Sequence, residues 1–363
     1  MSGGGWHPAL WRERPAAQQP VYADAAALAA SERALAEAPP LVLLEAVEAL
    51  RAELAEAAAG RALLLQGGDC AETFAEADVA GLAALFDRLA DVLPLPAVRV
   101  GRIAGQYAKP RTVEGRVWRG EIVNSRDALE PDPARLAQAY QHAAATVRRL
   151  PAGLYASHEA LLLPYEQALV RRAENGSWWS GSGHMLWLGE RTRQLNGAHV
   201  AFASGLANPL GVKLGAIGAD DLRALADRID PVREPGRLTL IVRMGAEIDS
   251  HLPPLMRALR QDGRQPLWVS DPLHGNTGRG GPRKVRRLED AVREVEAFTA
   301  IARSEGVHAG GLHLEMTPED VAEVTGGDEG EGWTSACDPR LNPRQAAAVT
   351  AAFAAALGQR DAA

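Results

Sequence analysis

The sequence predicts an α/β protein in which eight parallel strands close into a barrel. The chain has 363 residues, a length that single α/β barrels commonly reach. From residue 62 onward, short apolar runs alternate with helical patterns, which is the order of repeated strand-helix units. Eight runs of the strand type can be counted. The composition, 47% hydrophobic and 23% charged, is that of a globular protein with a large core.

Residues 1–60 are expected to form an N-terminal arm and helices packed on the barrel. The barrel itself would span 61–363, so that the chain forms one domain overall. The first part is rich in proline and alanine, which indicates an extended arm followed by helical segments. Ala46, Leu50, Leu54 and Ala57 keep one apolar face at helical spacing.

The strands and helices of the barrel can be placed in order. The expected strands are 62–66, 97–103, 154–157, 185–188, 198–203, 238–243, 267–270 and 311–315. The clearest helices are 134–150, 219–229, 252–261, 288–304 and 343–357. Only residues 189–197 separate the fourth and fifth strands, which is too few for a regular crossover helix. Either one strand is misassigned there or that unit is degenerate.

Charge and apolar patterning exclude several classes of function. With 39 basic and 46 acidic side chains the net charge is −7, which opposes sequence-independent binding of nucleic acid or anionic lipid. The basic segment 279–287 lacks the aromatic side chains of an RNA-binding strip. No apolar run reaches the length of a membrane span, and no secretory signal is found at the start. We therefore expect a cytoplasmic protein.

Four possible metal ligands lie where a barrel collects functional side chains, in the loops after the strand ends. They are Cys70, His274, Glu315 and Asp338. A thiolate, an imidazole and two carboxylates could together hold a divalent ion such as manganese, iron, cobalt or zinc, and the ligand types do not choose among these. Taken singly, each has an ordinary alternative as a buried cysteine, a loop histidine, a helix cap or a surface acid.

The same loops carry a surplus of cations, which is unexpected in an acidic chain. They are Arg102, Lys109, Arg111, Arg191, Lys213 and Arg243. Guanidinium groups match the geometry of phosphate and carboxylate, so two phosphorylated substrates would suit this set. The alternative is a ring of salt bridges with neighbouring glutamates at the barrel rim, Glu121, Glu159, Glu166 and Glu190.

Six ordered motifs resemble those of the type II 3-deoxy-D-arabino-heptulosonate 7-phosphate (DAHP) synthases, in a short form. The motifs occupy 64–74, 102–111, 157–163, 189–193, 271–277 and 336–340. The resemblance extends from about Trp11 to the C-terminal helix. It implies a (β/α)8 TIM barrel transferase that condenses phosphoenolpyruvate with erythrose 4-phosphate and water and releases phosphate. This reaction is the first step of the shikimate pathway of aromatic amino acid biosynthesis.

The resemblance also implies roles for individual residues. Cys70, His274, Glu315 and Asp338 match the family's metal ligands, with manganese the first choice and cobalt, iron, zinc or magnesium as alternatives. Positions that hold phosphoenolpyruvate match Arg102, Lys109, Glu190, Arg191, Lys213 and Arg243, of which Arg102, Lys109 and Glu190 are the expected catalytic residues. Positions near the aldose phosphate match Arg111, Thr112 and Lys284. A homo-oligomer is expected.

Two other functions stay open from the sequence. One is a paralogue that uses an imino or amino aldose phosphate in secondary metabolism, and the other is a catalytically silent barrel that binds a phosphorylated ligand. The segment 112–121, near the expected aldose phosphate contacts, is shorter than in long members of the family. The chain also lacks the N-terminal extension and added helices that serve feedback sites in long members, so we expect weak or no inhibition by aromatic amino acids. Because Cys337 adjoins Asp338, its thiol should lie near Cys70 and could pair with it when no metal is bound.

Overall fold

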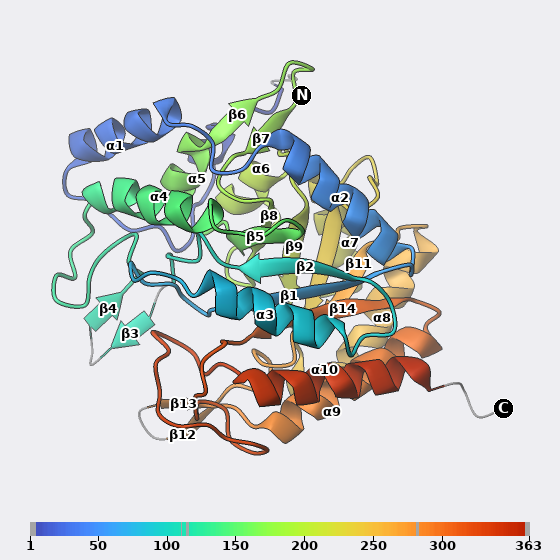
Figure 1. The fold of residues 1–363 in the computed structure, drawn as a ribbon. Coiled ribbons are helices and arrows are strands. Elements are labelled where there is room, and N and C mark those ends of the chain that lie inside the picture. The colour runs from blue at the N-terminus through green and yellow to red at the C-terminus, as the bar shows by residue number, and fades with distance from the viewer. Residues whose placement is uncertain (1–4, 110, 114–115, 281–282, 360–363) are drawn as a thin grey trace.

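The fold is a closed barrel of eight parallel strands (Figure 1), as the sequence predicts. The computed structural model describes residues 5–109, 111–113, 116–280 and 283–359. Within these ranges, the side chains of 111–113, 116 and 117 are not described. The order around the barrel is β1-β14-β11-β10-β9-β8-β5-β2. These strands are β1 (Leu63–Gly68), β2 (Ala97–Arg102), β5 (Leu154–Glu159), β8 (Met185–Leu188), β9 (Leu210–Leu214), β10 (Leu238–Val242), β11 (Leu267–Ser270) and β14 (Ala309–Glu315).

Helices cover the outside of the barrel. They are α3 (Val79–Ala90), α4 (Ala134–Val147), α5 (Leu163–Ala168), α6 (Ala198–Ala203), α7 (Ala219–Ile229), α8 (Ile248–Gln261), α9 (Leu288–Ser304) and α10 (Pro343–Gly358). A short 3-10 turn, η2 (Gly245–Glu247), precedes α8. Local sequence explains the start of α10, where Asn342 and Gln345 form a capping box around Pro343. None of the described helices is both long and apolar enough to cross a membrane.

The expected fifth strand is wrong. Residues 198–203 form the helix α6, and the fifth strand is β9 (Leu210–Leu214), a segment that the sequence pattern places in the following loop. All six residues of α6 are buried, and a short apolar run buried on every side does not reveal its period. The charged Lys213 interrupts the apolar pattern of β9, so the sequence does not indicate a strand there, although all five residues of β9 are buried. Lys213 therefore projects from a barrel strand rather than from the loop after it.

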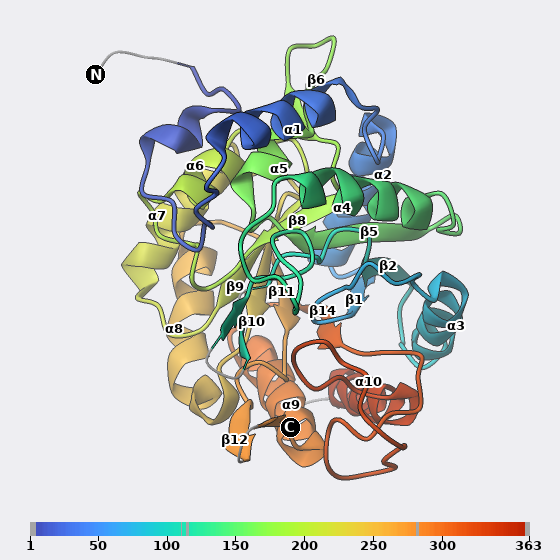
Figure 2. The ribbon, with the colours of Figure 1, turned by 90° about the vertical axis from the view of Figure 1, so that its left-hand side faces the viewer.

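The N-terminal segment packs against the barrel through three elements. These are η1 (Leu10–Glu13), α1 (Ala25–Glu37) and α2 (Leu44–Ala58). Figure 2 shows α1 lying against α4 and α5, while η1 contacts α6. Leu50, Leu54 and Ala57 of α2 join a buried cluster with side chains from inside the barrel, including Leu64 and Val98. The helix thus closes the end at which the strands begin.

Three two-stranded hairpins interrupt the strand-helix alternation, and the sequence did not predict them. The hairpin of β3 (Arg111–Val113) and β4 (Arg116–Trp118) follows β2. The hairpin of β12 (Gly278–Gly280) and β13 (Arg283–Val285) follows β11. The third, of β6 (Val170–Arg172) and β7 (Trp178–Ser180), precedes β8. The first two follow the carboxyl ends of barrel strands, where a barrel carries its functional loops.

Shortening a side chain of α2 tests the role of this helix. Leu54 is fully buried, so Leu54→Ala should lower the free energy of unfolding by about 2–5 kcal/mol through lost burial and the cavity it leaves. Leu43, which is 61% exposed just before the same helix, provides the matched control. Leu43→Ala should change stability by less than about 0.5 kcal/mol. Equal effects of the two changes in urea denaturation would contradict the packing described.

Candidate active site

A cavity of about 600 Å³ opens at the carboxyl ends of the barrel strands. Nine of the residues singled out from the sequence line it: Arg102, Lys109, Glu190, Arg191, Lys213, Arg243, His274, Lys284 and Asp338. Glu315 and Cys70 are fully buried beside it. Arg111 and Thr112 lie in β3, where side chains fall outside the described part of the structure. Side chains from β2, β8, β9, β10, β11 and the segment before α10 thus converge on one space.

His274, Glu315 and Asp338 form a compact group of metal-ligand type. One donor atom from each lies within 4.8 Å of the others. Asp271, fully buried, contacts His274 Nδ1 through both carboxylate oxygens, at 2.9 and 2.7 Å. Because a carboxylate can only accept, these two closer contacts place the imidazole proton on Nδ1, which Lys213 Nζ also approaches at 3.2 Å, and Nε2 faces Glu315 Oε1 at 3.1 Å. A carboxylate behind a histidine is the usual partner of a metal-ligating imidazole.

Ionisation states in this group favour a bound cation. Burial lowers the pKa of His274, so its Nε2 is available as a lone-pair donor. Burial alone would raise the pKa of Glu315, but the positive charges of Arg286, Lys109 and Arg102 hold it well below its usual range. The pKa of Asp338 is also lowered against burial, chiefly by Lys109. Both carboxylates are therefore charged although they are buried.

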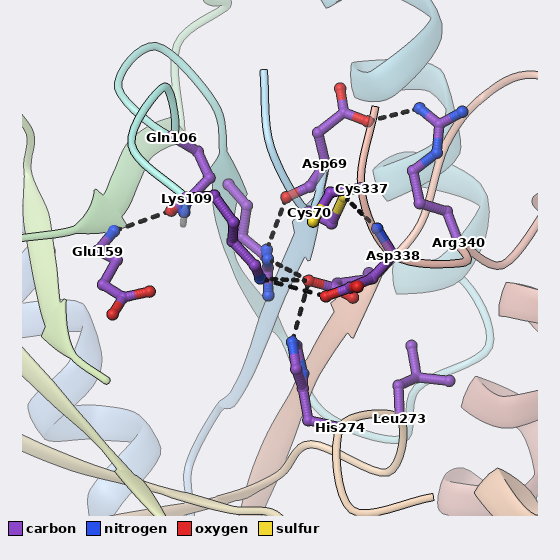
Figure 3. Close-up of polar contacts among 12 residues, drawn as sticks. Asp69, Cys70, Gln106, Lys109, Glu159, Leu273, His274, Cys337, Asp338 and Arg340 are labelled. Carbon is purple, nitrogen blue, oxygen red and sulfur yellow. Dashed lines mark hydrogen bonds and ion pairs between the residues drawn. The ribbon is translucent and has the colours of Figure 1, made fainter. Parts of the chain in front are cut away.

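Cys70 lies next to this group rather than within it (Figure 3). Its Sγ accepts a hydrogen bond from the backbone N–H of Asp338 at 3.0 Å and lies 3.3 Å from Ser335 Oγ. The thiol also contacts Cys337. Burial raises the pKa of Cys70 well above its ordinary value, and the neighbouring thiol and Glu315 act in the same direction. A thiolate at this position requires an added positive charge.

The cations of the cavity other than Arg191 are paired with acids of the chain. Arg102 donates to Glu315 Oε1 at 2.8 Å, and Lys213 Nζ donates to Asp271 Oδ2 at 2.6 Å. Burial lowers the pKa of Lys213 to about 8. Two further pairs stand nearer the opening, Arg243 with Glu190 and Lys284 with Asp338, the latter at 2.6 Å. Arg191 is exposed at the mouth.

Arg286 belongs to the site although the sequence did not single it out. Its side chain is 1% exposed, and Nη1 donates to Glu315 Oε2 and to Pro339 O, both at 2.5 Å. Nε donates to Thr277 Oγ1. Nη2 has no hydrogen-bond partner among the described residues, and the side chain lines the cavity. The only sequence signal was its place in a basic segment, which does not separate it from the exposed Arg283 or Arg287.

Buried glutamates outside the cavity lining hold the loops that carry the site. Glu72 accepts hydrogen bonds from the backbone N–H groups of Ala104, Gly105 and Gln106 at 2.7–2.9 Å. These residues lead into Lys109. Burial raises the pKa of Glu72 to about 7, against the effect of the three amides. Glu72 fixes the loop after β2 without touching the cavity.

Glu323 and Glu294 act in the same way on other loops. Glu323 accepts from the backbone N–H groups of Thr334 and Ser335 and pairs with Arg340, which fixes the segment containing Asp338. Glu294, on α9, accepts from the backbone N–H groups of Met244 and Gly245 and from Asn276 Nδ2. It thereby joins the loop after β10 to the loop after β11. The sequence gave no signal for either, because a bond to a distant backbone leaves no spacing pattern.

Comparison with known proteins finds consistent similarity along the chain. The model of the class-II DAHP synthetase family matches residues 6–154 and 150–356. A probable phospho-2-dehydro-3-deoxyheptonate aldolase of Pseudomonas fluorescens is 44% identical over 378 residues, covering 93% of this chain and 94% of the relative. The phospho-2-dehydro-3-deoxyheptonate aldolase of Streptomyces coelicolor is 39% identical over 440 residues, covering 97% of each chain.

A third relative extends the comparison to longer proteins. The phospho-2-dehydro-3-deoxyheptonate aldolase of Mycolicibacterium smegmatis is 36% identical over 436 residues, covering 96% of this chain and 93% of the relative. All three alignments, of 378, 440 and 436 positions, are longer than the chain of 363 residues, so these relatives contain segments that this chain lacks.

Glu294→Gln tests the loop-holding role through pH. Burial raises the pKa of Glu294 to about 7 from its ordinary 4.5, so the folded chain binds this proton more tightly than the unfolded chain. The resulting stabilisation is full below about pH 4.5 and is lost as the pH rises through about 7. The free energy of unfolding of the wild type, relative to Glu294→Gln, should fall over this range by up to about 1.4 kcal/mol per pH unit. A difference independent of pH would contradict the assignment, and Glu296→Gln, an exposed position on α9, is the control.

The two thiols predict an oxidation product. Neither Cys70 nor Cys337 is in a disulfide, and both are buried in one small cluster, so mild oxidation of the metal-free protein should join them. Mass spectrometry after alkylation should then show a loss of two hydrogen atoms, whose electrons pass to the added oxidant, and no alkylated thiol. Bound manganese should slow this reaction, because a metal-ligating sulfur is not free to attack. Two alkylated cysteines after prolonged oxidation would contradict the prediction.

Proposed function

Because this chain belongs to the class-II DAHP synthetase family, we propose that it condenses phosphoenolpyruvate with erythrose 4-phosphate and water to give DAHP and phosphate. This is the first step of the shikimate pathway. The observation that carries the proposal is the single cavity in which His274, Glu315 and Asp338 face a set of buried cations. Homo-oligomer formation and a cytoplasmic location stay predictions of the sequence.

The residues present fit a divalent metal ion, with manganese as the first choice and cobalt, iron, zinc or magnesium as alternatives. His274 offers one imidazole nitrogen, and Glu315 and Asp338 offer one carboxylate oxygen each, with the three atoms within 4.8 Å of one another. Cys70 Sγ accepts a hydrogen bond from the backbone N–H of Asp338 and so lies beside them. Such a mixed set suits a first-row divalent ion. When bound, the ion would supply Lewis acidity to the carbonyl oxygen of the aldose.

The cations would hold phosphoenolpyruvate. Arg191, Lys213 and Arg243 are the proposed contacts, with Arg102, Lys109 and Glu190 beside them, and all six line the cavity. The carboxylate and phosphate oxygens of the substrate would accept hydrogen bonds that these cations now donate to acids of the chain. One such pair is Arg243 with Glu190. Fixing two anions side by side against their repulsion removes much of the entropy cost of the reaction, about 7–11 kcal/mol in favourable cases.

Lys109 is placed to act at the reacting centre. Its Nζ lies 3.6 Å from Glu315 Oε1 and 3.5 Å from Asp338 Oδ2. Burial alone would lower the pKa of Lys109, but these two acids raise it above its ordinary value, so the ammonium keeps its proton. It can therefore donate a hydrogen bond to the oxygen that gains charge as C3 of phosphoenolpyruvate attacks the aldehyde carbon. Water then adds at C2, and cleavage of the C–O bond releases phosphate.

The aldose phosphate would lie nearer the opening. Lys284, whose side chain is 43% exposed, is the proposed contact from the hairpin after β11, and Arg111 and Thr112 are the proposed contacts from the hairpin after β2. Lys284 pairs with Asp338, so occupation of the metal site would free its ammonium for the substrate phosphate.

Substitution of the metal-site residues tests this proposal. Cys70→Ser and His274→Ala should each lower turnover by about 100-fold or more while the fold stays intact, since partners behind metal ligands alone change activity by about 10–100-fold. His251→Ala, a partly exposed histidine on α8, is the matched control. The assay is phosphate release from phosphoenolpyruvate with each aldose phosphate, erythrose 4-phosphate or its amino analogue, with and without a chelator.

The outcomes separate the candidate functions. Release that depends on erythrose 4-phosphate and on metal is the expected result. Release with the amino analogue alone would identify the paralogous reaction, and no release with either would indicate a silent binding protein. Undiminished turnover after removal of the metal would overturn the metal role.

A further inference from the structure

Gln18 brings the N-terminal arm, residues 6–24 before α1, into the active-site cavity. It is the only arm residue among the described residues that line this space, where it stands with Glu159 and Leu161. No hydrogen bond joins its side chain to any described residue, whereas Lys213 and Arg243 of the same cavity are paired with acids. A polar side chain from outside the barrel therefore offers an unused amide to the cavity.

The arm is fixed to the barrel on both sides of Gln18. The amide of the next residue, Gln19, donates to Leu161 O at 2.7 Å and accepts from Leu163 N at 3.1 Å. Before it, Pro15 O accepts from Ala198 N at 3.0 Å, and Trp11 Nε1 donates to Gln167 Oε1 at 2.8 Å. Figure 2 shows this segment running beside α5 and α6. The position of Gln18 is thus set by the fold.

The backbone at Gln18 is in a conformation that favours glycine over glutamine. Its φ is 61°, in the left-handed region that glycine adopts without strain and other residues rarely adopt. Among the described residues other than glycine, only Ala104 and Arg233 share a positive φ. Glycine would be the relaxed choice at position 18. A strained residue at a cavity wall points to a function of its side chain.

The surroundings of Gln18 favour the aldose phosphate over phosphoenolpyruvate as its partner. Besides the cavity, Gln18 borders a small space with Ala108 and Arg119, which lie before and after the hairpin β3-β4 in the chain. That hairpin carries Arg111 and Thr112, which are proposed for the aldose phosphate. The deep cations Arg102 and Lys213 are only 1% and 6% exposed, whereas Gln18 is half-buried at the rim.

We infer that Gln18 contacts the aldose phosphate and helps to select it, so that docking of the N-terminal arm completes the active site. This inference rests on the proposed function. A carboxamide both donates to a phosphate oxygen and accepts from a hydroxyl group, so it recognises a phosphorylated polyol without adding charge to a site that already balances many charges. The rigid placement by Gln19 makes this contact specific.

Kinetics of Gln18 variants test the inference. Gln18→Ala should raise KM for the aldose phosphate that supports turnover by about 10-fold, the effect of one lost hydrogen bond to a charged group, and leave KM for phosphoenolpyruvate within about 2-fold. Gln18→Gly should show the same kinetic change together with an unfolding midpoint at least equal to that of the wild type, because it relieves the strained backbone. Arg233→Gly, an exposed left-handed position away from the cavity, is the matched control and should leave both KM values unchanged.

A binding measurement makes the test independent of turnover. Erythrose 4-phosphate should raise Tm of the manganese-loaded wild type and raise it less in Gln18→Ala. Wild-type KM values in both Gln18 variants, a change confined to phosphoenolpyruvate, or an equal Tm rise in wild type and variant would each overturn the inference. Failure of the proposed function is seen separately, as a wild-type protein that releases no phosphate; if erythrose 4-phosphate also leaves its Tm unchanged, the role of Gln18 is overturned with it.

Discussion

The buried carboxylate of Glu315 is the charge around which the site is organised. Arg102 and Arg286 bind its two oxygens, and Lys109 and His274 approach Oε1. A buried acid is stable only with such partners, and each partner in turn needs an acid or a ligand. The cluster therefore combines fixed positive charge for anionic substrates with carboxylate oxygens for a metal ion. The surplus of strand-end cations in an acidic chain follows from this arrangement.

The barrel brings the side chains of the site together, and buried groups outside the cavity fix the loops that carry them. Glu72, Glu294 and Glu323 each bind backbone amides of a different loop, and Asp271 orients His274 while it pairs with Lys213. None of these roles requires contact with a substrate. Site loops that lack regular structure can hold reacting groups in place when buried acids satisfy their N–H groups.

Local pattern was enough to predict part of this structure. The helices predicted at 219–229 and 288–304 match α7 and α9 to the residue, because apolar side chains recur at helical spacing along the whole of each segment. The strand-end rule also located the cavity and its cations. The rule did not predict that Lys213 projects from within the buried strand β9. The assignment of 198–203 as a strand was wrong because the short apolar run of α6 shows no helical or strand period. Arg286, Glu294 and Gln18 were missed because their importance comes from contacts distant in sequence.

The most direct test of the account is the position of a bound metal ion. A crystal structure of the manganese-loaded protein, with anomalous scattering to identify the ion, should place one ion per chain within bonding distance of His274 Nε2, Glu315, Asp338 and Cys70 Sγ. Lys284 should then have left Asp338. An ion bound elsewhere, or no ion at this site under saturating manganese, would contradict the account.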